Sequence, residues 1–391
     1  MKKTNATGVA ALALLLFASP VSAQESLADA VSFLMTNRAV QTGDFASDQT
    51  AAEAARDAVS RALLVNVTNA PFGTSSGGFL YRLNPELGTV ERASANFGGF
   101  FVERALLAGA GTASFGFTAS AANYNQLDGH DLKDGTFVTT ANKFRSDAAP
   151  FDTESVTMNL HSNTVGFWAN VGVSDELELS VVVPVTRITL DGQRVNLYRG
   201  TSLVQSTAKG SASGLGDIAV RAKYGFFQSP VANLAASGEV RLPTGDETNL
   251  LGAGSAAVRL LGIASFETGR VGIHANGGIV RGGASDEVIL AGAIAAALHP
   301  RATLAMEVMR RWVSELHPLE LVGAPHPSVA GVDTFRLTAG PDAAALMTAA
   351  TGIKWNVTDT VVLSGQILWS LNGHGLTASV APTVALEYSL R

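Results

Sequence analysis

From about residue 112 to the C-terminus, apolar residues alternate with polar or small ones in stretches of roughly ten to fifteen residues. The gaps between these stretches are alternately short and long. This rhythm is typical of a transmembrane β-barrel, in which lipid-facing and lumen-facing side chains alternate along each strand and tight turns at one rim face longer loops at the other. The pattern therefore predicts an all-β protein, a closed antiparallel β-barrel that crosses a membrane.

The pattern predicts twelve strands, at residues 112–124, 155–173, 177–190, 215–227, 231–243, 256–266, 270–280, 287–298, 303–313, 346–357, 360–371 and 378–390. An even number places both ends of the barrel at the rim of the short turns, which faces the periplasm in bacterial barrels. A further pair of strands within 67–110 or 130–145 would give fourteen. A soluble β-sandwich also has alternating strands, but we do not expect it to keep small and apolar residues on one face over so long a chain. The expected short turns are 174–176, 229–230, 267–269, 299–301 and 356–359, and the expected long polar loops include 191–213 and 316–344.

Segment 155–173 is one long strand or two strands joined by a β-bulge. Its apolar residues change phase between Leu160 and Val165. An extra residue in one strand shifts the faces in this way, so a bulge would explain the change of phase.

The first residues have the three parts of a secretory signal. A charged start at Met1 to Lys3 is followed by an apolar run from Val9 to Phe17, and Val21-Ser22-Ala23 ends in small residues. An uncleaved anchor is the alternative, but the run is shorter than the roughly 18 residues of a spanning helix. Residues 1–23 are therefore predicted to be a cleaved signal peptide, and the barrel is expected in the outer membrane of a Gram-negative bacterium.

Residues 24–66 differ from the rest because they favour helix. Ser26 can cap a first helix, and Asp48 or Thr50 can cap a second one that is rich in alanine. This helical extension is either a periplasmic segment or plug inside the barrel, or a solvated leader with no role in gating. The remaining predicted domains are an irregular segment at 67–111 and the barrel at 112–391.

Composition agrees with an exported barrel. Charged residues make up 15% of the chain, against the usual quarter, and 40 of the 391 residues are glycine. The net charge of −6 leaves no basic surface for nucleic acid. The chain has no cysteine, which excludes disulfides and thiolate chemistry.

Ionisable residues fall mostly on the polar face of the expected strands, which would face the lumen. In lipid, each basic residue near the midplane would cost roughly 2–4 kcal/mol. These residues either set solute selectivity or pair with one another to hold a narrow barrel together. Pairing is favoured, because acidic and basic residues occur on neighbouring strands. The candidates for the lumen lining are Asp217, Arg221, Lys223, Glu239, Arg241, His274, Glu307 and Arg311.

The sequence assigns no catalytic residue. Barrel-type lipid hydrolases use a histidine and a serine in a pattern similar to His-x-Ser-Asn, whereas here His161 and Ser162 are adjacent. Neighbouring side chains of a strand point to opposite faces, so this pair would not share a proton. The seven histidines have no metal-ligand spacing, and Gly252 to Gly254 lacks the Lys-Ser/Thr and the helix of a phosphate loop. No metal or cofactor is expected.

Two glycine-rich segments carry a resemblance to a known family. Gly214-Leu215-Gly216-Asp217 precedes Lys223-Tyr224, and Leu242-Pro243-Thr244-Gly245-Asp246 precedes Leu251-Gly252-Ala253-Gly254. These segments resemble those of the outer-membrane transporter family linked to meta-pathway phenol degradation. The residues of this family motif are Gly214, Gly216, Asp217, Pro243, Gly245, Asp246, Gly252 and Gly254. Both aspartates either pair with basic groups or stabilise turns, and turn stabilisation is favoured.

The resemblance implies an outer-membrane channel for small hydrophobic or aromatic solutes, with membrane lipid and the barrel insertion machinery as its other partners. The last strand departs from the usual aromatic ending, since it carries Tyr388 and Leu390 and closes with Arg391. The alternatives are a structural barrel with a filled lumen and a lipid hydrolase.

Overall fold

The computed structural model describes residues 26–36, 40, 42–68, 78–84 and 89–390. The predicted signal peptide therefore lies outside the described residues. Among the described residues, no helix has both the length and the hydropathy needed to cross a bilayer.

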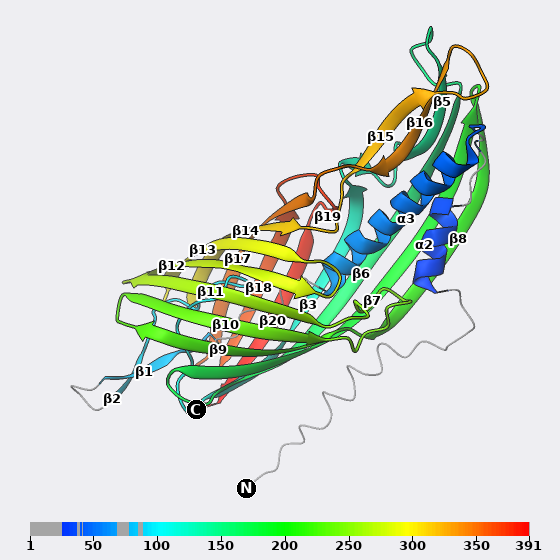
Figure 1. Ribbon diagram of the computed structural model, residues 1–391. Coiled ribbons are helices and arrows are strands. Elements are labelled where there is room, and N and C mark those ends of the chain that lie inside the picture. The colour runs from blue at the N-terminus through cyan, green and yellow to red at the C-terminus, as the bar shows by residue number, and fades with distance from the viewer. Residues whose placement is uncertain (1–25, 37–39, 41, 69–77, 85–88, 391) are drawn as a thin grey trace.

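Twelve antiparallel strands close into a ring (Figure 1). The ring closes where the last strand pairs with the first, from Thr383 opposite Ser120 to Leu390 opposite Ala113. The predicted twelve-stranded transmembrane barrel is confirmed. In order around the ring, the strands are β3 (Ala113–Leu127), β6 (Asp152–Gly172), β7 (Leu177–Tyr198), β9 (Ile218–Gln228), β10 (Ala232–Leu242), β11 (Ala257–Thr268), β12 (Val271–Gly282), β13 (Glu287–His299), β14 (Ala302–Val313), β17 (Ala344–Thr358), β18 (Val361–Ser370) and β20 (Ala381–Leu390).

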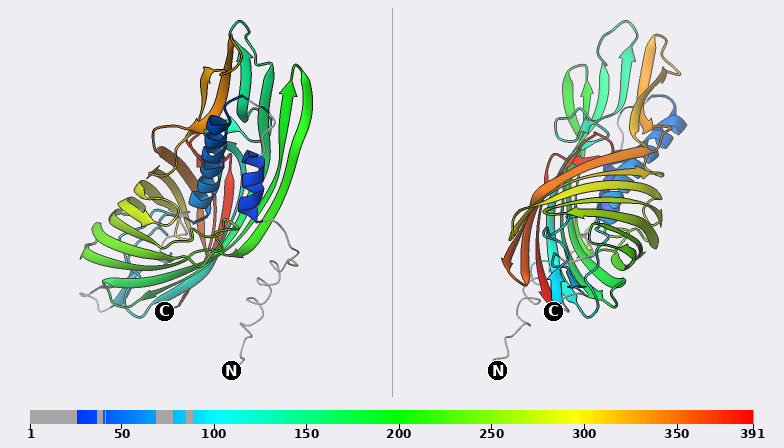
Figure 2. Two further views of the ribbon diagram at one scale, coloured as in Figure 1. Left: turned by 45° about the vertical axis from the view of Figure 1, so that its right-hand side comes forward. Right: turned by 90° about the vertical axis from the view of Figure 1, so that its left-hand side faces the viewer.

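Six further strands extend one side of the barrel beyond the rim of the long loops (Figure 2). The prediction of loops at 191–213 and 316–344 is wrong, because β7 continues to Tyr198 before β8 returns, and β15 and β16 form a hairpin. These strands lack the lipid-facing apolar row that made the others recognisable. Segment 130–145 does contribute strands, but they join this extension and leave the ring at twelve. The strands of the extension are β4 (His130–Asp131), β5 (Val138–Phe144), β8 (Thr201–Leu215), β15 (Leu319–Pro325), β16 (Val332–Ala339) and β19 (Leu376–Ala378).

The strand β6 is continuous, so one long strand, the first of the two alternatives, is confirmed, and the bulge is absent from this strand. Its pairing with β7 runs without a break from Asp152 opposite Tyr198 to Gly172 opposite Glu178. The change of phase arises because the apolar residues of β6 lie on the outer face in one part of the strand and on the inner face in the other. Phe167 is exposed on the outside, whereas Met158 and Leu160 are buried on the inside. The outer face meets lipid in the lower part of the strand, and the inner face packs on helices in the upper part.

Two helices lie along the inner side of this extension (Figures 1 and 2). The helix α2 (Leu27–Thr36) packs against β7 and β8, and α3 (Phe45–Thr68) packs against β16 and β19. The Leu27, Leu34 and Leu63 side chains join the largest apolar core of the described residues, together with inward residues of β6 and β7. The helices therefore fill the concave face of the extension.

The helix caps agree in part with the sequence. Ser26 Oγ accepts the Asp29 N–H at 3.1 Å, which confirms the first cap. The second helix starts earlier than predicted, because Asp44 Oδ1 accepts the Ser47 N–H at 3.1 Å. Asp48 is instead buried and accepts hydrogen bonds from Thr42 and Arg336. A two-stranded hairpin, β1 (Tyr81–Asn84) and β2 (Thr89–Arg92), precedes the barrel.

Candidate channel interior

Residues 94–110, which we call the internal segment, run through the interior of the barrel. The segment has no regular secondary structure, so its backbone groups bond to inward side chains of the wall. The Phe97 N–H donates to Thr303 Oγ1 on β14 at 3.0 Å, and the Ala105 N–H donates to Ser265 Oγ on β11 at 2.8 Å. The Ala108 N–H donates to Glu178 on β7 at 3.1 Å. The polar lining of the barrel therefore holds the chain's own residues.

Glu307 accepts several hydrogen bonds from the internal segment. Its carboxylate accepts the N–H groups of Phe100 at 2.5 Å, Phe101 at 2.9 Å and Val102 at 3.4 Å. Gly99 lies against the same carboxylate, and a Cβ there would meet Glu307 Oε1 at 2.1 Å. A buried carboxylate is stabilised when several N–H groups donate to it, so Glu307 and this turn of the segment depend on each other.

A second contact is a buried ionic cluster around Arg221. Its guanidinium contacts Glu103 of the internal segment and Glu239 of β10. Glu239 also accepts the Arg241 Nε–H at 2.8 Å. Lys223 Nζ lies 3.7 Å from Glu178 and 3.9 Å from Glu103. Charges from three wall strands and the segment are thus balanced inside the barrel.

All eight predicted lumen residues are buried on the inner side of the wall. Most of them pair with another group: Arg311 contacts Glu287 at 2.5 Å, and His274 Nδ1 lies 2.9 Å from Ser265 Oγ. Asp217 differs from the others because its carboxylate binds backbone N–H groups of a loop. Five further ionisable residues that contact these side chains or the internal segment were not predicted. Four of them lie on the polar face of their strands, which is a signal that the sequence offers, whereas Glu103 lies outside any strand. The missed residues are Glu103, Glu178, Glu267, Glu287 and Lys354.

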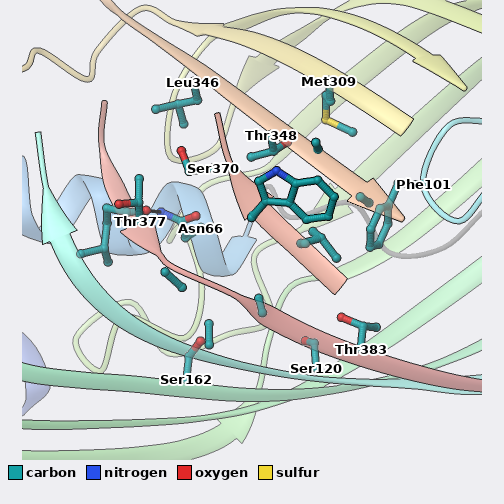
Figure 3. A pocket seen from close by; sticks show the side chains of 18 of the residues that line it. Asn66, Phe101, Ser120, Ser162, Met309, Leu346, Thr348, Ser370, Thr377 and Thr383 are labelled. Atoms are coloured by element: carbon teal, nitrogen blue, oxygen red, sulfur yellow. Dashed lines mark hydrogen bonds between the residues drawn. The ribbon is translucent and has the colours of Figure 1, made fainter. Parts of the chain in front are cut away.

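A cavity of about 190 Å³ lies between the end of α3, the internal segment and the wall (Figure 3). Asn66 lines it from α3 and Phe101 from the internal segment. Its wall combines apolar side chains, such as Met309 and Leu346, with a set of hydroxyl groups. The hydroxyl-bearing residues labelled in Figure 3 are Ser120, Ser162, Thr348, Ser370, Thr377 and Thr383.

The family motif builds a loop at the rim. The Asp217 carboxylate accepts the Gly245 N–H at 3.0 Å and the Ala253 N–H at 2.8 Å. Gly252 lies so close that a Cβ would meet Asp217 Oδ1 at 2.6 Å. These contacts are those of turn stabilisation. The other motif glycines are also close to neighbours or strained, with Gly214 near Leu251, Gly216 near Pro184, Gly245 near Gly252 and Gly254 at φ +69°.

Asp246 stabilises the same loop, which in turn contacts α2. The Asp246 carboxylate accepts hydrogen bonds from Thr248 and Asn249. The side-chain hydrogen bond from Thr248 is the main cause that lowers the pKa of Asp246. The Thr248 carbonyl in turn accepts the Ala28 N–H at 3.2 Å. Pro243 is the first residue after the end of β10.

The structure places His161 and Ser162 on opposite faces of β6. Ser162 is buried and its Oγ lies 3.1 Å from the Tyr124 hydroxyl, whereas His161 lines a hollow on the outer surface. The two side chains therefore cannot act together as base and nucleophile. Within the described part of the chain, no group of three or more metal-ligating side chains comes together.

A closed antiparallel ring with apolar side chains outside and balanced charges inside is a transmembrane β-barrel of the outer-membrane type. The family described as putative MetA-pathway of phenol degradation matches residues 128–309, just under half of the chain. This match confirms the resemblance carried by the glycine-rich segments.

Solved outer-membrane structures are similar at low identity. An outer-membrane channel from Pseudomonas putida F1 is 14% identical with a TM-score of 0.46, and the match covers 73% of this chain and 98% of that one. The KdgM porin is 8% identical with a TM-score of 0.36, covering 61% of this chain and 98% of that one. The translocator domain of the autotransporter NalP from Neisseria meningitidis is 10% identical with a TM-score of 0.35, covering 72% and 88%. Comparison with curated proteins finds no match.

Proposed function

We propose that the protein is an outer-membrane channel for small hydrophobic or aromatic solutes, and that the cavity beside Phe101 is a binding site on their path. The observation that carries the proposal is the lining of this cavity, in which hydroxyl groups alternate with apolar side chains. Ligand sites commonly combine an apolar wall with a few polar groups that orient the ligand. The family match, with its link to phenol degradation, supports the same solute class.

The size of the cavity suits a single substituted ring. An engineered cavity of about 150 Å³ in another protein takes up benzene, and the cavity here is about 190 Å³. A ring would pack against Phe101 and Met309, while its hydroxyl or carboxylate would bond to groups such as Thr348 and Ser370.

In this proposal the N-terminal residues close the channel. The internal segment fills the lower interior, and α2 and α3 fill the extension above it. A solute that crosses the barrel must therefore displace part of the internal segment. Export through the predicted signal peptide and insertion by the barrel assembly machinery belong to the same proposal.

A structural barrel with a permanently filled lumen is the second candidate, since Glu307 and Arg221 both bind the internal segment. The two functions differ in one measurable property. A channel passes solutes when it is reconstituted in liposomes, and a filled barrel does not.

The experiment is uptake of radiolabelled benzoate and phenol into proteoliposomes. The variant Thr348→Phe fills the cavity, and Thr351→Phe is its control because it lies on the outward face of the same strand. We expect Thr348→Phe to lower uptake roughly ten-fold, which corresponds to about 1.4 kcal/mol, and Thr351→Phe to leave it unchanged. If the parent protein passes neither ions nor aromatic solutes, the channel proposal fails.

A further inference from the structure

The outer surface of the barrel changes from apolar to polar at one level on three neighbouring strands. On β7, the outward residues from Leu177 to Val185 are apolar, and Arg187 follows them. Those nine residues match the length that a tilted strand needs to cross the hydrocarbon core, about 9–11 residues. Arg187 therefore lies at the edge of the lipid, on the side away from the short turns.

The same change occurs beside Arg187. Asn163 of β6 lies opposite Arg187 in the sheet register, and His161 lies opposite Asn123 of β3. Asn123, Asn163 and Arg187 are all exposed. The four side chains thus share one outward patch just above the apolar belt.

The patch is hollowed and carries basic side chains. A hollow of about 490 Å³ is lined by Asn123, His161, Asn163, Arg187 and Thr189. Lys133 stands at its margin, where its Nζ donates to Asn123 Oδ1 at 2.9 Å. Among the described residues, neither Arg187 nor Lys133 forms an ion pair. The nearby Asp131 carboxylate accepts the backbone N–H groups of Lys133 and Asp134.

We propose that this hollow binds the phosphorylated sugar headgroup of the outer-leaflet lipid, lipid A of lipopolysaccharide. The patch lies at the depth where lipid headgroups begin, and phosphate on a glucosamine is the anionic group that this lipid presents there. Arg187 would bind the phosphate through its planar guanidinium, and Lys133 would add a second positive charge. The amides of Asn123 and Asn163 and the His161 ring complement sugar hydroxyls. This inference is independent of which solute passes through the barrel.

The test measures binding of lipid A to the full mature chain in nanodiscs by native mass spectrometry. The probes are bisphosphorylated lipid A, dephosphorylated lipid A and inorganic phosphate. Arg187→Gln removes the proposed phosphate ligand. Lys209→Gln is the control, since Lys209 is exposed on the same outer face but pairs with Asp191 at 2.8 Å.

We expect bisphosphorylated lipid A to bind roughly ten-fold more tightly than the dephosphorylated form. Arg187→Gln should abolish this preference, and Lys209→Gln should keep it. Asn163→Asp is a second variant, because it places a carboxylate opposite Arg187, and it should weaken binding in the same direction. Equal binding of both lipids, equal loss in Lys209→Gln, or competition by inorganic phosphate without any preference between the lipids would overturn the proposal.

Discussion

At the scale of single residues, the interior of this barrel is a set of wall side chains that complete the hydrogen bonds of an irregular segment. Glu307 serves three N–H groups, and Arg221 joins Glu103 of the segment to Glu239 of the wall. Charges that would suit an open aqueous pore are thus used to hold a piece of chain in place. Their removal should release that piece.

Glu307→Ala is predicted to loosen the internal segment. A hydrogen bond to a charged group contributes about 1.5–3 kcal/mol, so the loss of three should cost roughly 4.5 kcal/mol or more locally. Hydrogen exchange of the amides at 100–102 should become faster, with Glu307→Gln intermediate because it keeps one acceptor oxygen. Glu320→Ala, at an exposed site on β15, is the matched control. Unchanged protection in Glu307→Ala would show that the segment is held by other contacts.

Asp246 gives a pH dependence outside the membrane. Hydrogen bonds from Thr248 and Asn249 lower its pKa, so its contribution to stability is present above the pKa of the unfolded chain, about 3.9, and is lost as the pH falls through the lower folded value. Acidification below about pH 4 should therefore weaken the loop and lower the protection factor of the Ala28 amide, which is the exchange rate of an unfolded chain at the same pH divided by the observed rate. Asp246→Asn should remove this dependence, and an NMR titration that finds an unshifted carboxyl would contradict it.

At the scale of elements, the strands show what a sequence can reveal and what it cannot. All twelve ring strands were predictable because lipid imposes one apolar row on each outer face, as with Leu179 and Val181 of β7. The extension was not predictable, because its outer face meets water and its polar residues look like loops. The change of phase at Leu160 was visible, but one strand cannot show whether a bulge or a change of surroundings causes it. The placement of Glu103 depends on tertiary contacts alone.

The outward residues of β7 change from apolar to polar along the strand. This change predicts that arginine substitutions at two outward positions differ in their cost to stability. Val181 lies in the middle of the apolar belt, and Thr189 lies beyond it on the same outer face. Val181→Arg should lower the free energy of unfolding in lipid vesicles by about 2–4 kcal/mol, and Thr189→Arg by about 0–1 kcal/mol. Urea unfolding followed by tryptophan fluorescence measures both. Equal costs at the two sites would contradict the proposed lipid boundary.

At the scale of the whole molecule, the described residues that precede the first barrel strand, those of α2, α3 and the internal segment, pack inside the barrel and its extension. Two helices occupy the extension (Figures 1 and 2), and the internal segment is bonded to the inner wall of the ring. The cavity lies where these parts meet the wall (Figure 3). We therefore propose that solute passage and movement of the internal segment are coupled.

The most direct test locks that segment to the wall. The chain has no cysteine, so Ala105→Cys with Ser265→Cys introduces a single pair at a site where the Ala105 N–H now bonds to Ser265 Oγ at 2.8 Å. Thiol titration shows whether the disulfide has formed, and benzoate uptake into proteoliposomes is then measured before and after reduction. We expect that the oxidised protein does not transport and that reduction restores the uptake of the parent. Equal uptake in the oxidised and reduced protein would contradict it.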